Sequence, residues 1–271
     1  MAESVDRLSA LRRQIASIER PRTVAAADVA TTGHDAIDAA LGGGLARGRL
    51  HEVFAIDPAD ASNSAGFAAM LALRLGGPLV WLRAEAAEAL GGKLHAPGLS
   101  EIGVDPGQMI MGVLPDPLTV LRAAADVVRC TGVGVTVIEL WRMPRALDLT
   151  ASRRLAVAAE ASGVTALLLR AEAEPSPSAA HTRWAVRSAA SAPLEANAPG
   201  HPAMEVELLR QRGRPAGGRW LVEWDRDRAI FREQRFGGPA LPGAVVPVPV
   251  RESCDAGPAA PLRPAALRRA G

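Results

Sequence analysis

The sequence predicts an α/β fold, in which a mainly parallel sheet is covered by helices on both faces. Apolar residues make up 48% of the 271 positions, while aromatic residues make up only 3%. A composition led by Ala, Leu and Val is typical of helices and buried parallel strands rather than of a β-sandwich. Short apolar runs also alternate with helical segments, which is the pattern of βαβ units.

The first 22 residues are expected to form an amphipathic helix. Its apolar side chains recur at steps of three and four, so they share one face of a helix. They include Leu8, Leu11, Ile15 and Ile18. Pro21 then stops the helical pattern. A helix separated in this way either folds back on the core or binds a partner in a groove, and we treat the four apolar residues as candidate partner contacts.

The core is expected to occupy residues 23–236. A short helix in "HDAIDAAL" leads to a glycine turn at 42–44 and a strand over 49–56. Helices are expected in "SAGFAAMLALRLGG", "TVLRAAADVVRC" and "SRRLAVAAEASG", and strands in "PLVWLRA", "GVTVIELW" and "VTALLLRA". These segments alternate along the chain, so the strands are predicted to lie parallel.

The last third of the chain lacks the alternation of helices and strands. Segment 173–200 is rich in Ala, Ser and Pro and is expected to contain a mobile loop, with a candidate strand in "HTRWAVRSAAS". Residues 203–233 predict antiparallel strands with a turn at Gly217 and Gly218. Residues 237–271 are dense in Pro, Gly and Ala, which predicts a flexible tail.

Composition excludes several functions. A net charge of +2 is too small to indicate a nucleic-acid partner by itself. The histidines and the two cysteines show no metal-ligand spacing, so no metal site is expected. No apolar run approaches the roughly 20 residues of a membrane helix, and the charged start is unlike a signal peptide. We therefore expect a cytoplasmic protein without a membrane anchor.

Several motifs in order resemble the RecA family, and more closely its ImuA members, which belong to bacterial damage-inducible mutagenesis cassettes. They are "TGHDAIDAALGGGLARGRLHEVFA", "APGLSEIGVDPGQMIM", "VRCTGVGVTVIELW", "HTRWAVRSAAS" and "VELLRQRGRPAGGRWLVEWD". Together they cover roughly residues 5–235. The resemblance implies a RecA-like core, with the antiparallel strands after the parallel ones.

The segment "AIDPADASNSAGF" stands where this fold would carry a phosphate loop. A Walker loop needs glycines so that its backbone N–H groups can surround phosphate oxygens, a lysine, and a hydroxyl for magnesium. Here the Gly-Lys-Ser/Thr sequence is missing, the only lysine of the chain is Lys93, and Asp57 and Asp60 add negative charge. We therefore expect neither tight ATP binding nor a cofactor. Ser62, Asn63 and Ser64 either cap the next helix or bind a different ligand.

Other positions of a RecA-type nucleotide site have changed less. By the resemblance, Glu85 matches the glutamate that activates the attacking water, and Glu139 matches the acidic Walker B position. Arg210 and Arg212 match basic residues that reach a nucleotide across a subunit interface. Alternatively, the two glutamates are acidic residues at strand ends and the two arginines lie on a solvated strand face. Because positioning and electrostatics supply most phosphoryl-transfer catalysis, we favour vestigial positions without ATPase activity.

Two arginine-rich segments are candidates for contact with single-stranded DNA. RecA proteins hold single strands with loops, and an arginine beside an aromatic ring suits stacking and phosphate neutralisation. The candidates are Arg183, Trp184, Arg187, Arg214 and Arg219. Trp184 could equally be a strand residue packed inward, and glutamates and an aspartate flank the second segment.

Three functions follow from the resemblance. The leading hypothesis is a non-catalytic accessory protein of SOS-induced mutagenesis that supports translesion synthesis. Its partner would be an ImuB-type inactive Y-family polymerase homologue and, through it, the sliding clamp and an error-prone C-family polymerase, with RecA and single-stranded DNA as further candidates. The alternatives are a RecA-type DNA-dependent ATPase or recombination modulator, and a SulA-like cell division inhibitor.

Overall fold

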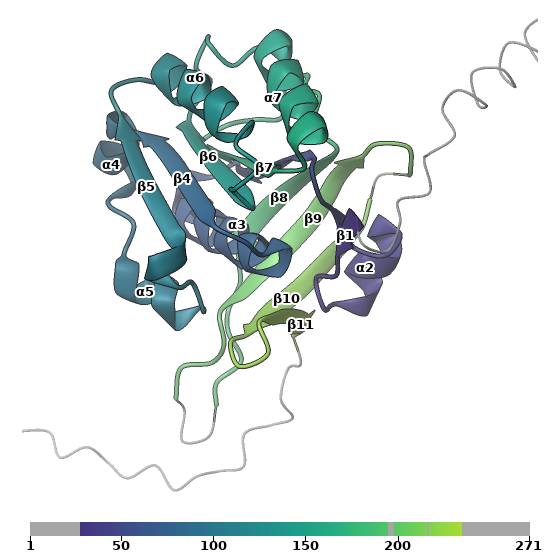
Figure 1. The fold of residues 1–271 in the computed structure, drawn as a ribbon. Helices are drawn as coiled ribbons and strands as arrows, with labels where there is room; N and C mark the ends of the chain where they lie inside the picture. Colours follow the sequence, from purple (N-terminus) through teal and green to yellow (C-terminus); the bar gives the residue numbers. More distant parts are fainter. Residues whose placement is uncertain (1–27, 195–197, 216, 235–271) are drawn as a thin grey trace, which may run out of the picture. The chain divides into compact units, whose positions relative to one another are not determined.

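The computed structural model describes residues 28–194, 198–215 and 217–234. Within these residues the main sheet has nine strands, in the order β11-β10-β9-β8-β3-β7-β6-β4-β5 (Figure 1). The strands that lie parallel are β3 (Leu50–Ala55), β4 (Leu79–Ala84), β5 (Met109–Leu114), β6 (Val135–Trp141), β7 (Thr165–Ala171) and β8 (Thr182–Ser188). The antiparallel continuation consists of β9 (Ala203–Gln211), β10 (Arg219–Asp225) and β11 (Ile230–Glu233).

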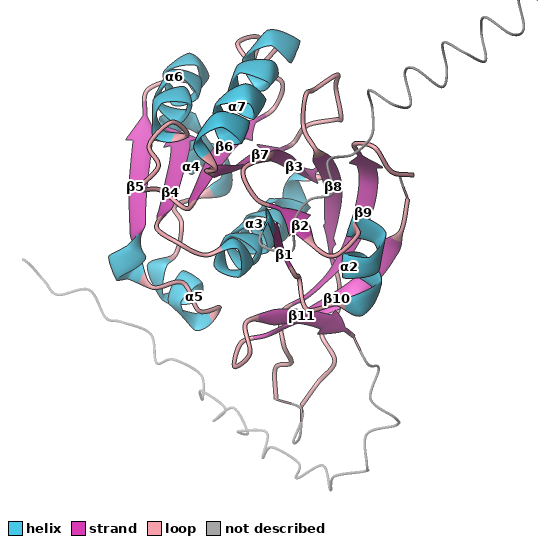
Figure 2. Ribbon diagram, turned by 45° about the vertical axis from the view of Figure 1, so that its right-hand side comes forward, coloured by secondary structure: helices cyan, strands magenta, loops and turns pink. Residues whose placement is uncertain are grey.

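Helices cover both faces of the parallel half of this sheet. Helix α3 (Ala61–Leu75) packs on one face against β3, β7 and β8. Helices α6 (Pro117–Val127) and α7 (Leu149–Ser162) lie beside one another on the opposite face (Figure 2). The short helices α4 (Glu85–Gly91) and α5 (Ala96–Glu101) follow β4. The predicted α/β class, with a parallel sheet, helices on both faces and antiparallel strands after it, is confirmed.

Burial on both faces explains why the central parallel strands are mostly apolar. Strands β3, β4 and β7 are buried at every position, because one face packs on α3 and the other on α6 and α7. Trp81, Trp184 and Trp224 are completely buried on the α3 side. Burying large aromatic side chains contributes heavily to the hydrophobic core. The packing of this core fixes the positions of the parallel strands, and the candidate site lies on and just after these strands.

The "TGHD" and triple-glycine motifs have structural roles before β3. The Asp38 carboxylate of α2 (Asp35–Leu41) accepts hydrogen bonds from the backbone N–H groups of Thr32 and Gly33, at 2.7 and 3.2 Å. Gly42 ends the helix in the left-handed conformation, with φ of 80°. A Cβ on Gly44 would lie 2.4 Å from the Ala30 carbonyl oxygen, so only glycine fits there.

Parts of the fold were not expected from the sequence. The edge strand β5 and the helices α4 and α5 lie in a stretch without a clear pattern. Two short strands, β1 (Val29–Ala30) and β2 (Leu45–Ala46), pair antiparallel outside the main sheet. The expected partner helix, with Leu8, Leu11, Ile15 and Ile18, and the tail 237–271 lie outside the described residues. In the described part of the chain no helix is long and apolar enough to cross a bilayer.

Candidate functional site

The loop between β3 and α3 occupies the position of a phosphate loop, but its donors are used internally. It forms the short 3₁₀ turn η2 (Pro58–Asp60) that runs directly into α3. The Asp57 side chain accepts from the N–H of Ala59 at 2.8 Å, and the Asp57 carbonyl accepts from the N–H of Asp60 at 3.0 Å. The N–H of Ala61 donates to the Pro58 carbonyl. Three successive N–H groups are thus unavailable to a phosphate, and Pro58 has none.

The second acidic residue of this loop fastens it to the sheet. Oδ1 of Asp60 accepts hydrogen bonds from both the backbone N–H and the side-chain hydroxyl of Ser188, at 2.7 and 2.8 Å. Ser188 is the last residue of β8. Hydrogen bonds to a charged acceptor are stronger than neutral ones, so this contact holds the loop against β8.

The polar residues after the loop lie inside the first turn of α3. The N-cap position belongs to Asp60, which makes no side-chain capping bond. Ser62 is exposed, and Asn63 Nδ2 donates to the Ala203 carbonyl at 3.4 Å. The hydroxyl of Ser64 is buried and has no hydrogen-bond partner among the described residues. Of the two interpretations left open for these residues, capping of α3 does not fit, because α3 begins at Ala61 and all three residues lie within the helix.

Glu139 lies within a buried network rather than at a strand end. It is the fifth residue of β6 and only 3% exposed. Its Oε1 accepts from Arg83 Nη2 at 2.9 Å and from Trp141 Nε1 at 2.8 Å, and its Oε2 accepts from Trp81 Nε1 at 2.9 Å. Both carboxylate oxygens are thus engaged by protein donors. A magnesium ion at this position would have to displace them.

The other vestigial positions are accessible. Glu85 is the exposed first residue of α4, directly after β4. Arg210 is exposed near the end of β9, where its Nη1 donates to the Ser178 carbonyl at 3.5 Å, and Arg212 is exposed just beyond that strand. Arg210 matches the solvated strand face considered from the sequence, whereas Arg212 is exposed beyond the end of the strand. Glu85 is a strand-end residue, whereas the same interpretation of Glu139 was wrong.

Two of the proposed DNA contacts are buried, and that assignment was wrong. Trp184 is completely buried and packs edge-on against Phe67, with ring centroids 6.0 Å apart. Arg183 is 8% exposed, and its Nε donates to Oε2 of Glu52 at 2.7 Å. Its guanidinium carbon lies 5.1 Å from the centroid of the Phe54 ring. Neither side chain can reach a base or a phosphate, because β8 is a central strand rather than part of a loop.

The remaining DNA candidates lie near the surface among carboxylates. Arg187 and Arg219 both pair with Glu205 and Glu207, at distances between 2.9 and 3.7 Å. These pairs balance charge across neighbouring strands. Arg214 is exposed and lies close to Gly42 at the end of α2, where a positive charge suits the helix dipole. None of these three forms a stacking platform with an exposed aromatic ring within the described residues.

Sequence reasoning missed a second buried polar chain, at the start of β3 and β8. His51 Nε2 lies 2.8 Å from the Ala46 carbonyl, which only accepts, so this nitrogen carries the proton. The Thr182 hydroxyl lies 2.7 Å from His51 Nδ1 and accepts from Trp184 Nε1 at 2.8 Å. Burial lowers the pKa of His51 to about 3, so the ring is neutral. The ladder between β3 and β8 that joins these residues has no local sequence signal.

The site contains no evident metal centre. In residues 28–194, 198–215 and 217–234, no three His, Cys, Asp or Glu side chains gather closely enough to hold an ion. The loop carboxylates of Asp57 and Asp60 and the buried carboxylate of Glu139 are each engaged by protein donors. These hydrogen bonds therefore hold the β3–α3 loop and β6 in place. Among the four acidic candidates, Glu85 is the one for which the described residues provide no such hydrogen bond.

Comparisons with known proteins find a partial sequence similarity and a shared fold. No protein-family model matches the chain. In an alignment 151 positions long, which covers 51% of this chain, the sequence is 31% identical to the protein RecA of Acidothermus cellulolyticus. The match spans 42% of that relative, which is less than half its length. The crystal structure of the RadB recombinase shares the fold, with a TM-score of 0.51 and 16% identity over 76% of this chain and 99% of that one.

Proposed function

We propose that this protein is a RecA-like accessory protein of DNA-damage-induced mutagenesis that works without hydrolysing ATP. It would support translesion synthesis by binding an ImuB-type inactive polymerase homologue and, through it, a sliding clamp and an error-prone C-family polymerase. The RecA similarity and the RecA-like fold support a link to DNA repair. The motifs that resemble ImuA support the narrower role.

The observation that carries the non-catalytic part is the loop between β3 and α3. Phosphoryl transfer depends on donors and a metal that surround the phosphates. Here the N–H groups of residues 59–61 are engaged within the loop, and Asp60 holds the loop against β8. Reopening this loop around a triphosphate would break several hydrogen bonds, each contributing about 1 kcal/mol.

A second candidate is a RecA-type ATPase, favoured by the exposed carboxylate of Glu85 at the end of β4. In such an enzyme Glu85 would activate the attacking water, so its removal would abolish function. In an accessory protein the same exposed side chain is dispensable. Glu85 therefore separates the two functions.

The experiment is complementation of a strain that lacks the gene. Ultraviolet-induced mutation frequency should fall in the deletion strain and be restored equally by the wild-type protein and by Glu85→Ala. A tagged wild-type protein should also co-purify the ImuB-type homologue. Failure of Glu85→Ala at normal protein level would favour the ATPase, and unchanged mutagenesis in the deletion strain would contradict the mutagenesis role.

A further inference from the structure

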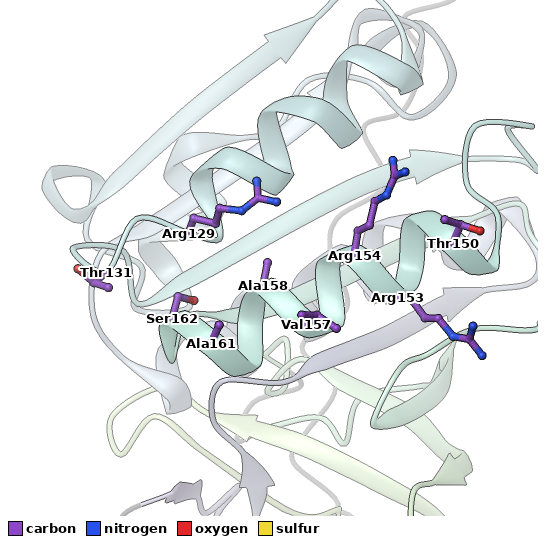
Figure 3. Close-up of a pocket in the computed structure, with 9 residues that line it drawn as sticks. All are labelled: Arg129, Thr131, Thr150, Arg153, Arg154, Val157, Ala158, Ala161 and Ser162. Atoms are coloured by element: carbon purple, nitrogen blue, oxygen red, sulfur yellow. The ribbon is translucent and has the colours of Figure 1, made fainter.

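The seam between α6 and α7 carries a surface groove far in sequence from the β3–α3 loop. One hollow of about 570 Å³ runs along α7 and reaches the end of α6 (Figure 3). It is lined by Arg129, Thr131, Thr150, Arg153, Arg154, Val157, Ala158, Ala161 and Ser162. A second hollow between Leu118, Arg122 and Ala125 of α6 and Leu155 of α7 adjoins it, because both are lined by Thr150 and Arg154. We call the two together the α6–α7 groove.

The groove combines an apolar floor with basic edges. On α7, positions 150, 153, 154, 157, 158 and 161 follow helical spacing, so they share one face. Val157 is 66% exposed, and Leu118 at the start of α6 is 45% exposed. Arg153 and Arg154 leave α7 in diverging directions on either side of this stripe (Figure 3). Apolar side chains framed by charges are typical of a partner-binding surface.

Charge is poorly balanced within the groove. Arg153, Arg154 and Arg122 are exposed, and none forms an ion pair with a carboxylate of the described residues. Arg129 bonds only its helix neighbours, the Ala125 carbonyl and Asp126. Asp148 caps α7 by accepting from the N–H of Ala151 at 2.7 Å, and Asp116 at the start of α6 interacts electrostatically with Arg122. The positive charge of the groove that lacks an ion-pair partner among the described residues is therefore that of Arg153 and Arg154.

We propose that the α6–α7 groove binds an acidic, amphipathic helical segment of a partner protein. The apolar face of such a helix would cover Val157 and Leu118, and its carboxylates would meet the arginines, as in helix-in-groove recognition. Residues 1–27 and 235–271 of this chain match such a segment less well, since each carries more basic than acidic side chains. Nucleic acid fits less well, because no aromatic side chain lines the groove for stacking.

The proposal that the α6–α7 groove binds a partner rests on the side chains of α6 and α7. It does not depend on the proposed role in mutagenesis. The test is selection from a displayed library of helical peptides that share a leucine face and vary in charge. Peptides of about 16 residues suit the length of α7, since a helix rises about 1.5 Å per residue. Against the full-length protein, the enriched peptides should be acidic. Enrichment of neutral or basic peptides, or no enrichment of any peptide, would overturn the proposal.

Variants then locate the binding surface. The affinity of an enriched peptide, measured by fluorescence anisotropy, should fall at least tenfold with the double change Arg153→Glu and Arg154→Glu, and also with Val157→Asp. The exposed residue Arg226, on the turn after β10, provides the matched control Arg226→Glu, which should leave affinity unchanged. Equal binding to the double variant would overturn the proposal.

A charge swap makes the test independent of folding defects. A peptide in which lysines replace the glutamates should bind the Arg153→Glu, Arg154→Glu protein better than it binds the wild type. Binding of a labelled oligothymidine to the same proteins tests the alternative that the groove binds single-stranded nucleic acid. If the oligonucleotide binds the wild type and the double variant abolishes that binding, the groove is a nucleic-acid surface and the peptide proposal is wrong.

Discussion

The surroundings of the β3–α3 loop and the α6–α7 groove, on opposite sides of the sheet, use charge in different ways. On the α3 side, the carboxylates of Asp57, Asp60 and Glu139 are each satisfied by donors of the same chain. On the other side, Arg153 and Arg154 of the α6–α7 groove have no carboxylate partner among the described residues. In this RecA-like fold, carboxylates around the β3–α3 loop and in β6 are held by internal bonds, while two exposed arginines of a helical surface are not. The following variants test this contrast.

The largest effect is expected from Glu139→Ala. The change leaves the guanidinium of Arg83, which is 2% exposed, without its counter-ion. Removing one partner of a buried ion pair costs about 3–5 kcal/mol, because the other charge stays buried. Urea unfolding should show this loss. The exposed Glu85→Ala is the matched control and should change stability by less than about 0.5 kcal/mol. Similar values for the two variants would contradict a structural role for Glu139.

A pH-dependent effect is expected from His51, on the strand that leads into the loop. Its pKa is lowered by burial to about 3, against 6.5 in the unfolded chain. The unfolded state therefore takes up a proton first, and the stability present above pH 6.5 is lost as pH falls toward 3. Between pH 7 and 5 this costs about 2 kcal/mol, since one pH unit corresponds to about 1.4 kcal/mol.

The measurement is the free energy of unfolding at both pH values for the wild type and for His51→Asn. The variant will be less stable at pH 7, but the drop between pH 7 and pH 5 should shrink by about 2 kcal/mol, because asparagine does not titrate. An identical drop in both proteins would show that His51 is not held neutral in the fold.

A smaller effect is expected where the loop meets β8. Asp60→Ala removes the acceptor of two hydrogen bonds from Ser188 and should cost about 1 kcal/mol, because the contact is exposed. Asp60→Asn keeps an acceptor oxygen and should lose less. Hydrogen exchange of the Ser188 amide should rise in the alanine variant. No change at that amide would indicate that the loop is held by other contacts.

The smallest effect on stability is expected in the α6–α7 groove. Val157 is 66% exposed, so Val157→Asp should alter the free energy of unfolding by less than about 0.5 kcal/mol. This near-neutrality would distinguish a binding surface from a core position. A loss above about 2 kcal/mol would place Val157 in the core and weaken the contrast between the two sides.

The sequence predicted the layers of the fold because the buried parallel strands are predominantly apolar, as in "VTALLLRA" for β7. It did not predict β5, whose residues Ile110, Met111 and Val113 are 40% exposed or more at the sheet edge. A strand without buried neighbours on one side carries no strong pattern. The absence of a Gly-Lys-Ser/Thr sequence at the phosphate-loop position could also be recognised from the sequence, because that motif consists of consecutive residues.

Partners distant in the chain could not be predicted. Arg183 and Trp184 look like a nucleic-acid motif in isolation, but β8 pairs with β3, so Glu52 binds the Arg183 guanidinium. Trp184 is buried against Phe67 of α3. Arg83 and Glu139 are likewise joined only by the pairing of β4 with β6. Such pairs depend on sheet order, which no local pattern encodes.

The central claim is that the β3–α3 loop does not bind a nucleotide. Calorimetric titration of Mg²⁺–ATP into the full-length protein, with and without single-stranded DNA, tests it directly. We expect no saturable binding up to about 1 mM ATP, which corresponds to a binding free energy weaker than about −4 kcal/mol. Saturable binding at micromolar ATP that Glu139→Gln abolishes without unfolding the protein would contradict it.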